Sequence, residues 1–176
     1  MISGNNIFIR ALETNDVDFI YYLENDVEIW KYGTTIAPLS KDNIKGFIHN
    51  SNTYDIYTLK QLRLIICRKT DHQAIGCIDI TDFNPKNRRA TIGIVIMKDE
   101  RHKGYADEAL RAICDYTFNI LNLNQLYCEI ADNNYNSIKL FTHNGFKLCG
   151  TKRNWIITDS GWQDVSFYQK LNTITP

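Results

Sequence analysis

Residues 101–106 have the composition and the position of a binding loop for a phosphate-bearing ligand. They read Arg-His-Lys-Gly-Tyr-Ala and lie between a strand-like run ending at Met97 and a long helix-like run beginning at Gly104. The first N–H groups of a helix have no helical carbonyl to donate to, and the helix dipole adds positive charge there. Gly104 and Ala106 are small enough to let a ligand approach the backbone. We therefore predict a phosphate or diphosphate site here; an ordinary solvated loop is the alternative reading.

Other nucleotide and metal motifs are absent from the sequence. The loop is neither a GxxxxGK[ST] P-loop nor a GxGxxG fingerprint, so neither ATP nor NAD is supported. The five cysteines form no CxxC pair, and the four histidines form no HExxH motif or Cys/His cluster. We therefore expect no metal site, and we expect the cysteines to be reduced and mostly buried.

The amino-acid composition limits the classes of protein to which this chain can belong. The chain has 176 residues, with 20 Lys and Arg balanced by 20 Asp and Glu. This balance gives no basic footprint for nucleic acid or an anionic membrane. No apolar run approaches the roughly 20 residues that span a bilayer, and the N-terminus lacks a signal-peptide pattern. We expect a single domain over residues 1–176 in the cytoplasm, without nucleic-acid or membrane partners.

The elements that must position the loop indicate a mixed α+β fold. The apolar patterns predict seven strands and four helices, and the strands and helices do not strictly alternate. Three consecutive strands joined by short links suggest an antiparallel meander, and the last two strands are expected to join at residues 159–161. The predicted strands are 7–10, 61–68, 74–83, 89–97, 126–130, 146–158 and 162–171, and the helices are 15–25, 40–50, 104–121 and 134–144.

Two signatures in the expected order resemble those of the GNAT superfamily of acyl-CoA-dependent N-acetyltransferases. Residues 101–106 resemble its [Q/R]xxGx[G/A] signature. Residues 134–146 resemble its second signature, in which an Asn opens a helix, an Ala or Ser follows three residues later, and the helix ends in Gly-Phe. The segments 9–13 and 88–90 also resemble the branch that contains bacterial spermidine and ribosomal-protein N-terminal acetyltransferases. The resemblance covers roughly residues 7–171.

This resemblance implies a fold, a co-substrate and a mechanism. The fold is a three-layer one, with a mostly antiparallel sheet of about seven strands, splayed in the middle, and about four flanking helices. Acetyl-CoA inserts its pantetheine like an extra strand, and an amine attacks the thioester directly in a ternary complex. Asn134 contacts the cofactor arm. Pantetheine pairs with the backbone of Ile94, Val95 and Ile96, and the diphosphate lies on the amides of Arg101, His102, Lys103, Gly104, Tyr105, Ala106 and Asp107.

The catalytic positions depart from the family pattern. Phe141 stands where many relatives carry a Tyr proposed to protonate the leaving thiolate, and Thr91 stands where a Glu often acts as base. An ammonium must lose a proton before it can attack, so a carboxylate is needed nearby. Asp79 is the predicted catalytic base. Asp82 lies three residues further on, which places the two carboxylates on opposite strand faces unless the strand is irregular.

The resemblance favours a small polyamine or diamine as the acceptor. A multiply charged cation needs a pocket lined with carboxylates. Glu28, in the acidic run 24–28, and Asp82 are therefore predicted to bind the substrate, although a solvated charged face would have the same composition. Relatives commonly form homo-oligomers, but no sequence pattern here indicates one. The sequence does not identify the acceptor amine or the source of the leaving-group proton.

Three other readings stay open at this stage. A protein N-terminal acetyltransferase would need an open peptide groove in place of an acidic pocket. A catalytically silent acyl-CoA-binding module is suggested by the loss of ionisable groups at Phe141 and Thr91. A structural protein without a CoA site is the third reading, in which Gly104 would matter only for stability.

Overall fold

One sheet of eight strands organises the chain. The computed structural model describes residues 2–31, 33, 35–158 and 161–173. The strand order is β1-β2-β3-β4-β5-β6-β8-β7, and every pairing is antiparallel except that of β5 with β6. The strands are β1 (Ile2–Ser3), β2 (Ile7–Ala11), β3 (Leu62–Arg68), β4 (Ala74–Asn84), β5 (Arg89–Ile96), β6 (Gln125–Ala131), β7 (Lys147–Thr158) and β8 (Gly161–Leu171). The predicted mixed α+β fold is confirmed.

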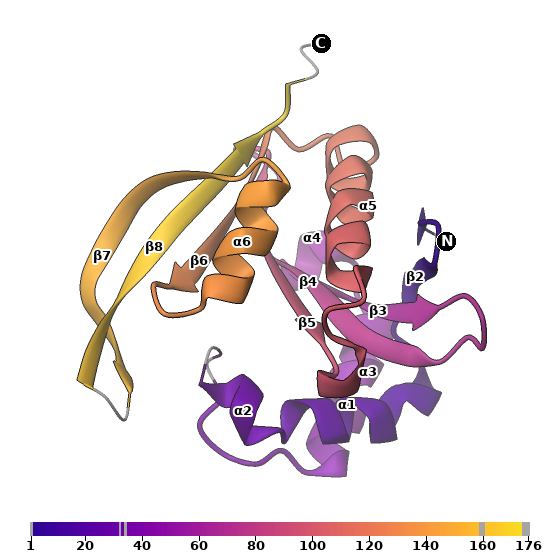
Figure 1. The fold of residues 1–176 in the computed structure, drawn as a ribbon. Helices are drawn as coiled ribbons and strands as arrows, with labels where there is room; N and C mark the ends of the chain where they lie inside the picture. Colours follow the sequence, from indigo (N-terminus) through magenta and orange to yellow (C-terminus); the bar gives the residue numbers. More distant parts are fainter. Residues whose placement is uncertain (1, 32, 34, 159–160, 174–176) are drawn as a thin grey trace.

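Helices cover both faces of this sheet, which makes three layers (Figure 1). Helices α5 and α6 pack on one face, and α1 and α3 pack on the other. The β7–β8 hairpin, yellow in Figure 1, curves away from α5. The helices are α1 (Val17–Glu24), α2 (Val27–Trp30), α3 (Lys41–Thr53), α4 (Ile56–Leu59), α5 (Tyr105–Asn119) and α6 (Tyr135–His143), with 3-10 turns η1 (Thr14–Asp16) and η2 (Lys98–Glu100).

The described elements include all those expected and several more. The seven predicted strands correspond to β2–β8, and the four predicted helices correspond to α1, α3, α5 and α6. The expected counts were low, because β1 has two residues and α2 and α4 have four each. Such short segments contain too little of either period to be detected. The expected turn at 159–161 involves Asp159 and Ser160, which lie outside the described residues.

The central strands are buried from both sides, which explains their nearly continuous apolar sequence. In β3, Leu64 and Ile66 belong to the core under α5, whereas Ile65 and Cys67 belong to the core under α1 and α3. In β5, Ala90, Ile92 and Ile96 face α5 as the alternation predicts. The intervening side chains, including that of Thr91, therefore face the α1 and α3 side, where polar groups gather near the middle of the sheet.

The boundaries of the helices follow local capping chemistry. Ser40 caps α3, because its hydroxyl accepts a hydrogen bond from the Asn43 amide at 3.1 Å. Gly145 follows α6 with φ +83°, a left-handed conformation that favours glycine and ends a helix. In the part of the chain that the structure describes, no helix has the length and apolar character needed to cross a membrane.

Candidate active site

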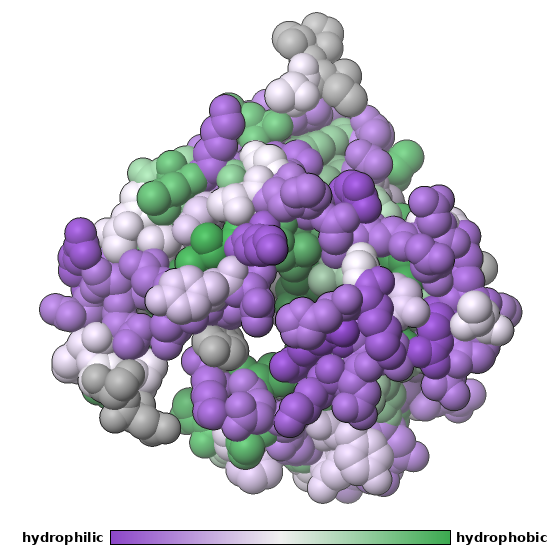
Figure 2. All heavy atoms as spheres, viewed as in Figure 1, coloured by the Kyte–Doolittle hydropathy of each residue, from purple (hydrophilic) through white to green (hydrophobic). Residues whose placement is uncertain are grey.

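Strands β5 and β6 part after three paired residues. Arg89 lies opposite Gln125, Ala90 opposite Leu126, and Thr91 opposite Tyr127. Beyond Thr91, β5 stays paired with β4 and β6 stays paired with β8, so a gap opens between β5 and β6. Figure 2 shows a hollow on this side of the molecule, between α5 and α6, with apolar surface at its depth. An extended ligand can therefore pair with the β5 backbone there, as an additional strand would.

Residues 101–106, the predicted phosphate-binding segment called here the anion loop, lie at the open end of this gap. Gly104 is the N-cap of α5 and has φ +84°, which brings the chain sharply into the helix. The Arg101 guanidinium donates from Nε to the carbonyl oxygen of Ile96 at 3.0 Å. The structure thereby brings the two predicted cofactor segments, 94–96 and 101–107, to the same end of β5. The amides of the first α5 turn have no helical acceptor and remain available to a ligand.

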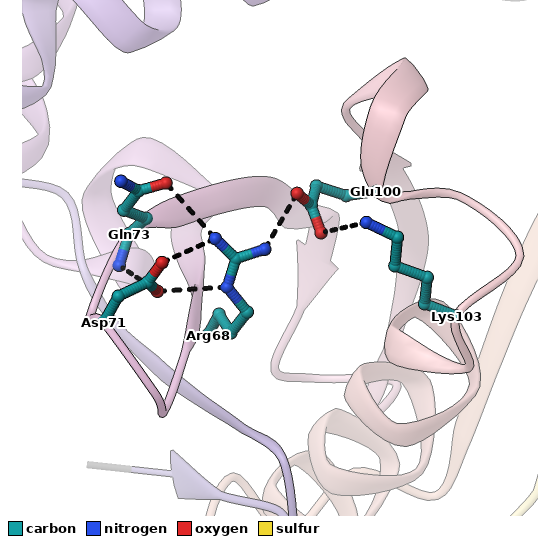
Figure 3. Close-up of polar contacts among 5 residues, drawn as sticks. All are labelled: Arg68, Asp71, Gln73, Glu100 and Lys103. Carbon is teal, nitrogen blue, oxygen red and sulfur yellow. Dashed lines mark hydrogen bonds and ion pairs between the residues drawn. The ribbon is translucent and has the colours of Figure 1, made fainter.

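An ion-pair network braces the start of this loop (Figure 3). Arg68, at the end of β3, donates to Glu100 at 2.8 Å and to both oxygens of Asp71 at 3.0 and 2.6 Å. Glu100 also accepts a hydrogen bond from Lys103 at 3.1 Å. Hydrogen bonds from Arg68 and then from Lys103 lower the pKa of Glu100. The β3–β4 hairpin is thus tied to η2, immediately before the loop.

The other predicted cofactor residues differ in what they offer a ligand. His102 is exposed and has φ +61°. The Asp107 carboxylate accepts a hydrogen bond from Asn144 at 2.8 Å and pairs with Arg111 at 2.5 Å, so it links α5 to α6. The contribution of Asp107 to an anion site is therefore its backbone amide. Asn134 caps α6 by accepting from the Ser137 amide at 3.2 Å, and its side-chain amide group can still donate.

On the opposite sheet face, Asp79 is engaged in an ion triad. Arg63 donates to its two carboxylate oxygens at 2.7 and 2.9 Å, and also donates to Glu24 of α1. The Arg63 guanidinium lies 5.5 Å from the ring centroid of Phe47. Burial alone would lower the pKa of Arg63, but the charge of Asp79 and its hydrogen bond raise it above its ordinary value. Asp79 is therefore held in an ion pair with Arg63, and its role as the catalytic base stays a prediction.

A cavity of about 310 Å³ opens beside this triad, between α1 and α3 and the sheet. Most of its walls are apolar, and Arg63, Glu24 and Asp79 supply its charges. Gly93 lies opposite Asp79 on β5 and adds no side chain over the neighbouring strand. The lining residues are Ile20, Glu24, Leu39, Asn43, Ile44, Phe47, Gln61, Leu62, Arg63, Asp79 and Thr81.

Asp82 reaches the same face because β4 is irregular. The register with β5 shifts between Thr81 and Asn84, and Asp82 itself has φ +47°. Tyr127 of β6 alternates with core residues that face α5, so its ring lies on the α1 and α3 side. The Tyr127 hydroxyl donates to the Asp82 carboxylate. Burial and then this hydrogen bond raise the pKa of Tyr127.

Glu28, the other predicted substrate ligand, lies on α2. Its carboxylate is exposed and pairs with Lys31 at 2.8 Å, and that hydrogen bond lowers the pKa of Glu28. The charges of Lys98 and Arg101 act on it in the same direction. Among the described residues, Glu28 makes no hydrogen bond or ion pair with Asp79 or Asp82. Glu28 is thus influenced by cations at the start of the loop, and its role as a substrate ligand stays a prediction.

The positions that depart from the family pattern have structural uses. Phe141 is 3% exposed and packs edge-on against Phe146, with ring centroids 5.0 Å apart. Its ring belongs to the core between α6 and the sheet. Thr91 lies opposite Tyr127 at the last pair before the strands part, and its hydroxyl interacts with the Tyr127 phenol. The two positions thus supply packing and polar contact instead of an ionisable group.

Metal ligands do not cluster anywhere in the described ranges: no group of three or more His, Cys, Asp or Glu side chains is placed to hold a metal ion. Four cysteines are buried, and Cys149 is exposed. Burial raises the pKa of the Cys114 thiol to about 11. The buried thiols are consequently protonated and unreactive near neutral pH.

Sequence reasoning missed several residues that shape the site. Arg63 and Arg68 are cations in a strand predicted from its apolar content. Three of their partners lie far along the chain, namely Glu24, Asp79 and Glu100. A charged residue inside an apolar strand is itself a signal that a buried partner exists. Tyr127 gave no such signal, because an aromatic residue in a strand ordinarily packs. Glu24 belongs to the acidic run 24–28, and nothing in that run distinguishes it as the partner of Arg63.

Comparison with known proteins places this geometry among acetyltransferases. The chain is 27% identical over 162 residues to a spermidine N(1)-acetyltransferase of Vibrio cholerae, covering 92% of this chain and 91% of that protein. It is 26% identical over 152 residues to the Escherichia coli K12 enzyme of the same name, covering 85% and 77% of the two chains. An uncharacterised N-acetyltransferase of Bacillus licheniformis, p20, is 28% identical over 147 residues, covering 84% and 82%.

Solved structures agree in fold. The spermidine N-acetyltransferase of Vibrio cholerae in complex with CoA and spermine superposes with a TM-score of 0.85 at 26% identity, covering 94% of this chain and 95% of that one. A dodecameric structure of that enzyme gives a TM-score of 0.78 at 25% identity, covering 94% of each chain. The family described as acetyltransferase (GNAT) domain matches residues 6–147. With its two signatures, its splayed strands and its predicted anion loop within that match, the chain belongs to the GNAT acetyltransferase family.

Proposed function

We propose that this protein transfers the acetyl group of acetyl-CoA to a primary amine of a small polyamine or diamine. The observation that carries the proposal is the parting of β5 and β6 next to the N-terminus of α5. The gap offers an unpaired strand edge of a length that suits the pantetheine arm, and the helix terminus offers amides to a diphosphate. The two features lie at the same end of β5, as one elongated ligand requires.

The residues fit acetyl-CoA in their chemistry. The backbone of Ile94, Val95 and Ile96 would pair with the amide groups of pantetheine. The amides of residues 101–107 would hold the diphosphate, and the Gly104 conformation turns them towards one point. Asn134 would donate to the cofactor arm from its side-chain amide. Acetyl-CoA supplies the activated acyl group, and the protein supplies position and polarisation.

The sheet face that packs against α1 and α3 is called here the acceptor face, and its charges support a cationic substrate. Glu24, Asp79 and Asp82 carry three negative charges on this face, against the two positive charges of Arg63 and of Arg89, which acts on the neighbouring Tyr127. An excess of negative charge attracts and orients ammonium groups. The named relatives from Vibrio cholerae and Escherichia coli act on spermidine, which agrees with this charge balance. A peptide N-terminus as the acceptor would not require this excess of negative charge.

The mechanism follows from placing both substrates at one point. The amine attacks the thioester carbonyl directly, and holding the two reactants together removes much of the entropic cost. A backbone N–H of β5 would donate to the carbonyl oxygen as negative charge develops on it. The released thiolate is a tolerable leaving group because its ordinary pKa is near 8.5. An acidic side chain at position 141 is therefore not required for the thiolate to leave.

We also propose that the chain forms one domain that associates with copies of itself. All eight strands belong to one sheet, and the two apolar cores pack on the two faces of that sheet. The edge strand β7 is mostly exposed, and a long open edge is usually covered. The dodecameric Vibrio cholerae neighbour is consistent with such assembly. Sedimentation velocity on the purified protein tests it.

Calorimetric titration and a thiol-release assay test the function. Acetyl-CoA and CoA are titrated into the protein, and release of CoA thiol is followed with polyamines, amino acids and short peptides. We expect CoA binding and release that depends on spermidine or a diamine. Release only with peptides would favour an N-terminal acetyltransferase. Binding without release would favour a silent module, and no binding would refute the proposal.

A further inference from the structure

Asp82 lies at the strained point of β4. Its φ of +47° is in the left-handed region, where a residue other than glycine is uncommon, although Asp tolerates it better than most. The strand register with β5 is interrupted at the same place, between Thr81 and Asn84. Backbone strain of this kind persists where the surroundings hold it, and it often marks a functional position. Here it turns the Asp82 carboxylate towards Tyr127.

Tyr127 is held from two sides. Its ring stacks on Phe167 of β8, with centroids 5.2 Å apart and an angle of 29° between the planes. Its hydroxyl donates to the Asp82 carboxylate across β5. Because Tyr127 lies opposite Thr91, the Asp82–Tyr127 pair stands where β5 and β6 part. The pair therefore lies beside the place at which the proposed function brings thioester and amine together.

The two carboxylates of β4 differ in their freedom to accept a proton. Both oxygens of Asp79 are bonded to Arg63, and a proton could bind there only at the expense of that ion pair. Asp82 is exposed and receives its hydrogen bond from a neutral phenol. The charged and polar groups that act on the phenol are Asp82 of β4 and Arg89 and Thr91 of β5. Asp82 thus keeps carboxylate lone pairs that can take a proton from a bound substrate ammonium.

We propose that Asp82 is the base that takes the proton of the acceptor ammonium, and that Tyr127 is the positioning residue that holds the Asp82 carboxylate in place. This inference rests on the proposed function and reassigns the roles expected for Asp79 and Asp82. The N–H bond of the ammonium breaks, and its proton passes to an Asp82 oxygen and then to water. The free amine forms the new C–N bond as the C–S bond breaks, and its second proton neutralises the thiolate. The products are the acetamide, CoA thiol and one released proton.

Four variants test the assignment in the full-length protein. For Asp82→Asn at neutral pH, kcat with a polyamine should fall about 100-fold, the lower range for loss of a general base. For Tyr127→Phe, which keeps the stacked ring, the fall should be about 10-fold, as for loss of a hydrogen bond to a charged group. Affinity for CoA should stay unchanged in both. Asp42→Asn and Tyr54→Phe change exposed residues outside the site and should match the wild type.

The dependence on pH separates a base from a structural role. At about pH 10 a large fraction of an alkyl amine is unprotonated and needs no base. The Asp82→Asn variant should then recover most of the wild-type rate, measured in parallel at the same pH. Asp82→Glu should keep more activity than Asp82→Asn at neutral pH, because it retains a carboxylate. Thermal unfolding of each variant verifies that the fold is intact.

Three outcomes would overturn the assignment. A rate ratio between Asp82→Asn and wild type that is the same at both pH values would show a structural effect only. Full activity of Asp82→Asn, or pH rescue of Asp79→Asn in its place, would return the role to Asp79. If the wild type releases no thiol with any amine, the proposed function fails and this inference falls with it. The first two results leave the acetyltransferase function standing.

Discussion

Arg63 and Asp79 face each other on neighbouring strands and share two hydrogen bonds, from Nε to Oδ1 at 2.7 Å and from Nη2 to Oδ2 at 2.9 Å. The same guanidinium donates to Glu24, so a single cation connects β3, β4 and α1. Side-chain exposure of the Arg63–Asp79 pair is 19% and 24%, which limits screening by water. The contact fixes the helix layer against the sheet at the edge of the cavity.

Replacing Arg63 with Met should destabilise the protein by about 1–3 kcal/mol. The variant leaves two neighbouring carboxylates without their cation, and the cost is reduced because both stay partly hydrated. Urea denaturation measures the change in the free energy of unfolding. Arg63→Lys keeps the charge but not the two parallel hydrogen bonds, so its loss should be smaller. A stability of Arg63→Met equal to that of wild type would contradict the structural role given to the triad.

Gly104→Glu should weaken CoA binding at least 10-fold. A Cβ at this position would meet no atom within 4 Å, so the substitution causes no collision. The left-handed backbone at φ +84° costs a residue other than glycine about 1–2 kcal/mol of conformational strain, and the new carboxylate places a negative charge where we propose that a diphosphate binds. Gly104→Asn is the matched control, because Asn tolerates this conformation and adds no charge. Calorimetric titration that gave equal affinities for Gly104→Glu and wild type would argue against the anion site.

The Arg68–Glu100 contact should matter for acetyl-CoA rather than for the chemical step. Arg68→Gln releases η2 from the β3–β4 hairpin, so the loop before α5 becomes less ordered and the KM for acetyl-CoA rises several-fold. The value of kcat should change little, because the network lies away from the acceptor face. Arg153→Gln, which removes an exposed ion pair of the C-terminal hairpin, serves as the control. An unchanged KM would mean that the loop holds its shape without the brace.

The same network should give a recognisable pH dependence of stability. Arg68 holds the pKa values of Asp71 and Glu100 below their ordinary values of 3.8 and 4.5. A lowered folded-state pKa stabilises the protein above the ordinary value, and that contribution disappears as the pH falls through the folded value. The difference in melting temperature between wild type and Arg68→Gln should therefore be largest near neutral pH and shrink below about pH 4. A difference independent of pH would exclude the ion pairs as its source.

The parts of the fold that follow local rules could be predicted from the sequence. The apolar spacing along 104–121 predicts α5, and Ser40 correctly marks the start of α3. Both depend on residues a few positions apart. The splay of β5 from β6 was expected only from the family resemblance, since nothing in either strand sequence sets where pairing stops. The sequence also places residues 101–106 correctly between a strand and a helix, and their role in anion binding stays a prediction.

The acceptor face could not be predicted in the same way. An uninterrupted strand puts Asp79 and Asp82 on opposite faces, and only the break at Asp82, with its positive φ, brings them to one face. Arg63 and Tyr127 find their partners across the sheet and from α1, so their roles depend on tertiary contacts. The sequence points to Asp79 and Asp82 as candidates but cannot distinguish the paired carboxylate from the exposed one.

Thiol chemistry provides a test of the core that is independent of catalysis. Cys67, Cys77, Cys114 and Cys128 are buried, and burial raises their pKa values, so little reactive thiolate forms near pH 8. Cys149 on β7 is exposed. Brief treatment of the native protein with iodoacetamide should therefore modify Cys149 alone, as read by peptide mass spectrometry, and Cys149→Ser should remain unlabelled. Unfolding in urea should make all the remaining thiols react. Rapid labelling of Cys77 or Cys128 in the native state would show that the sheet opens, because neither thiol can be reached while β4 and β6 stay packed beneath their helices.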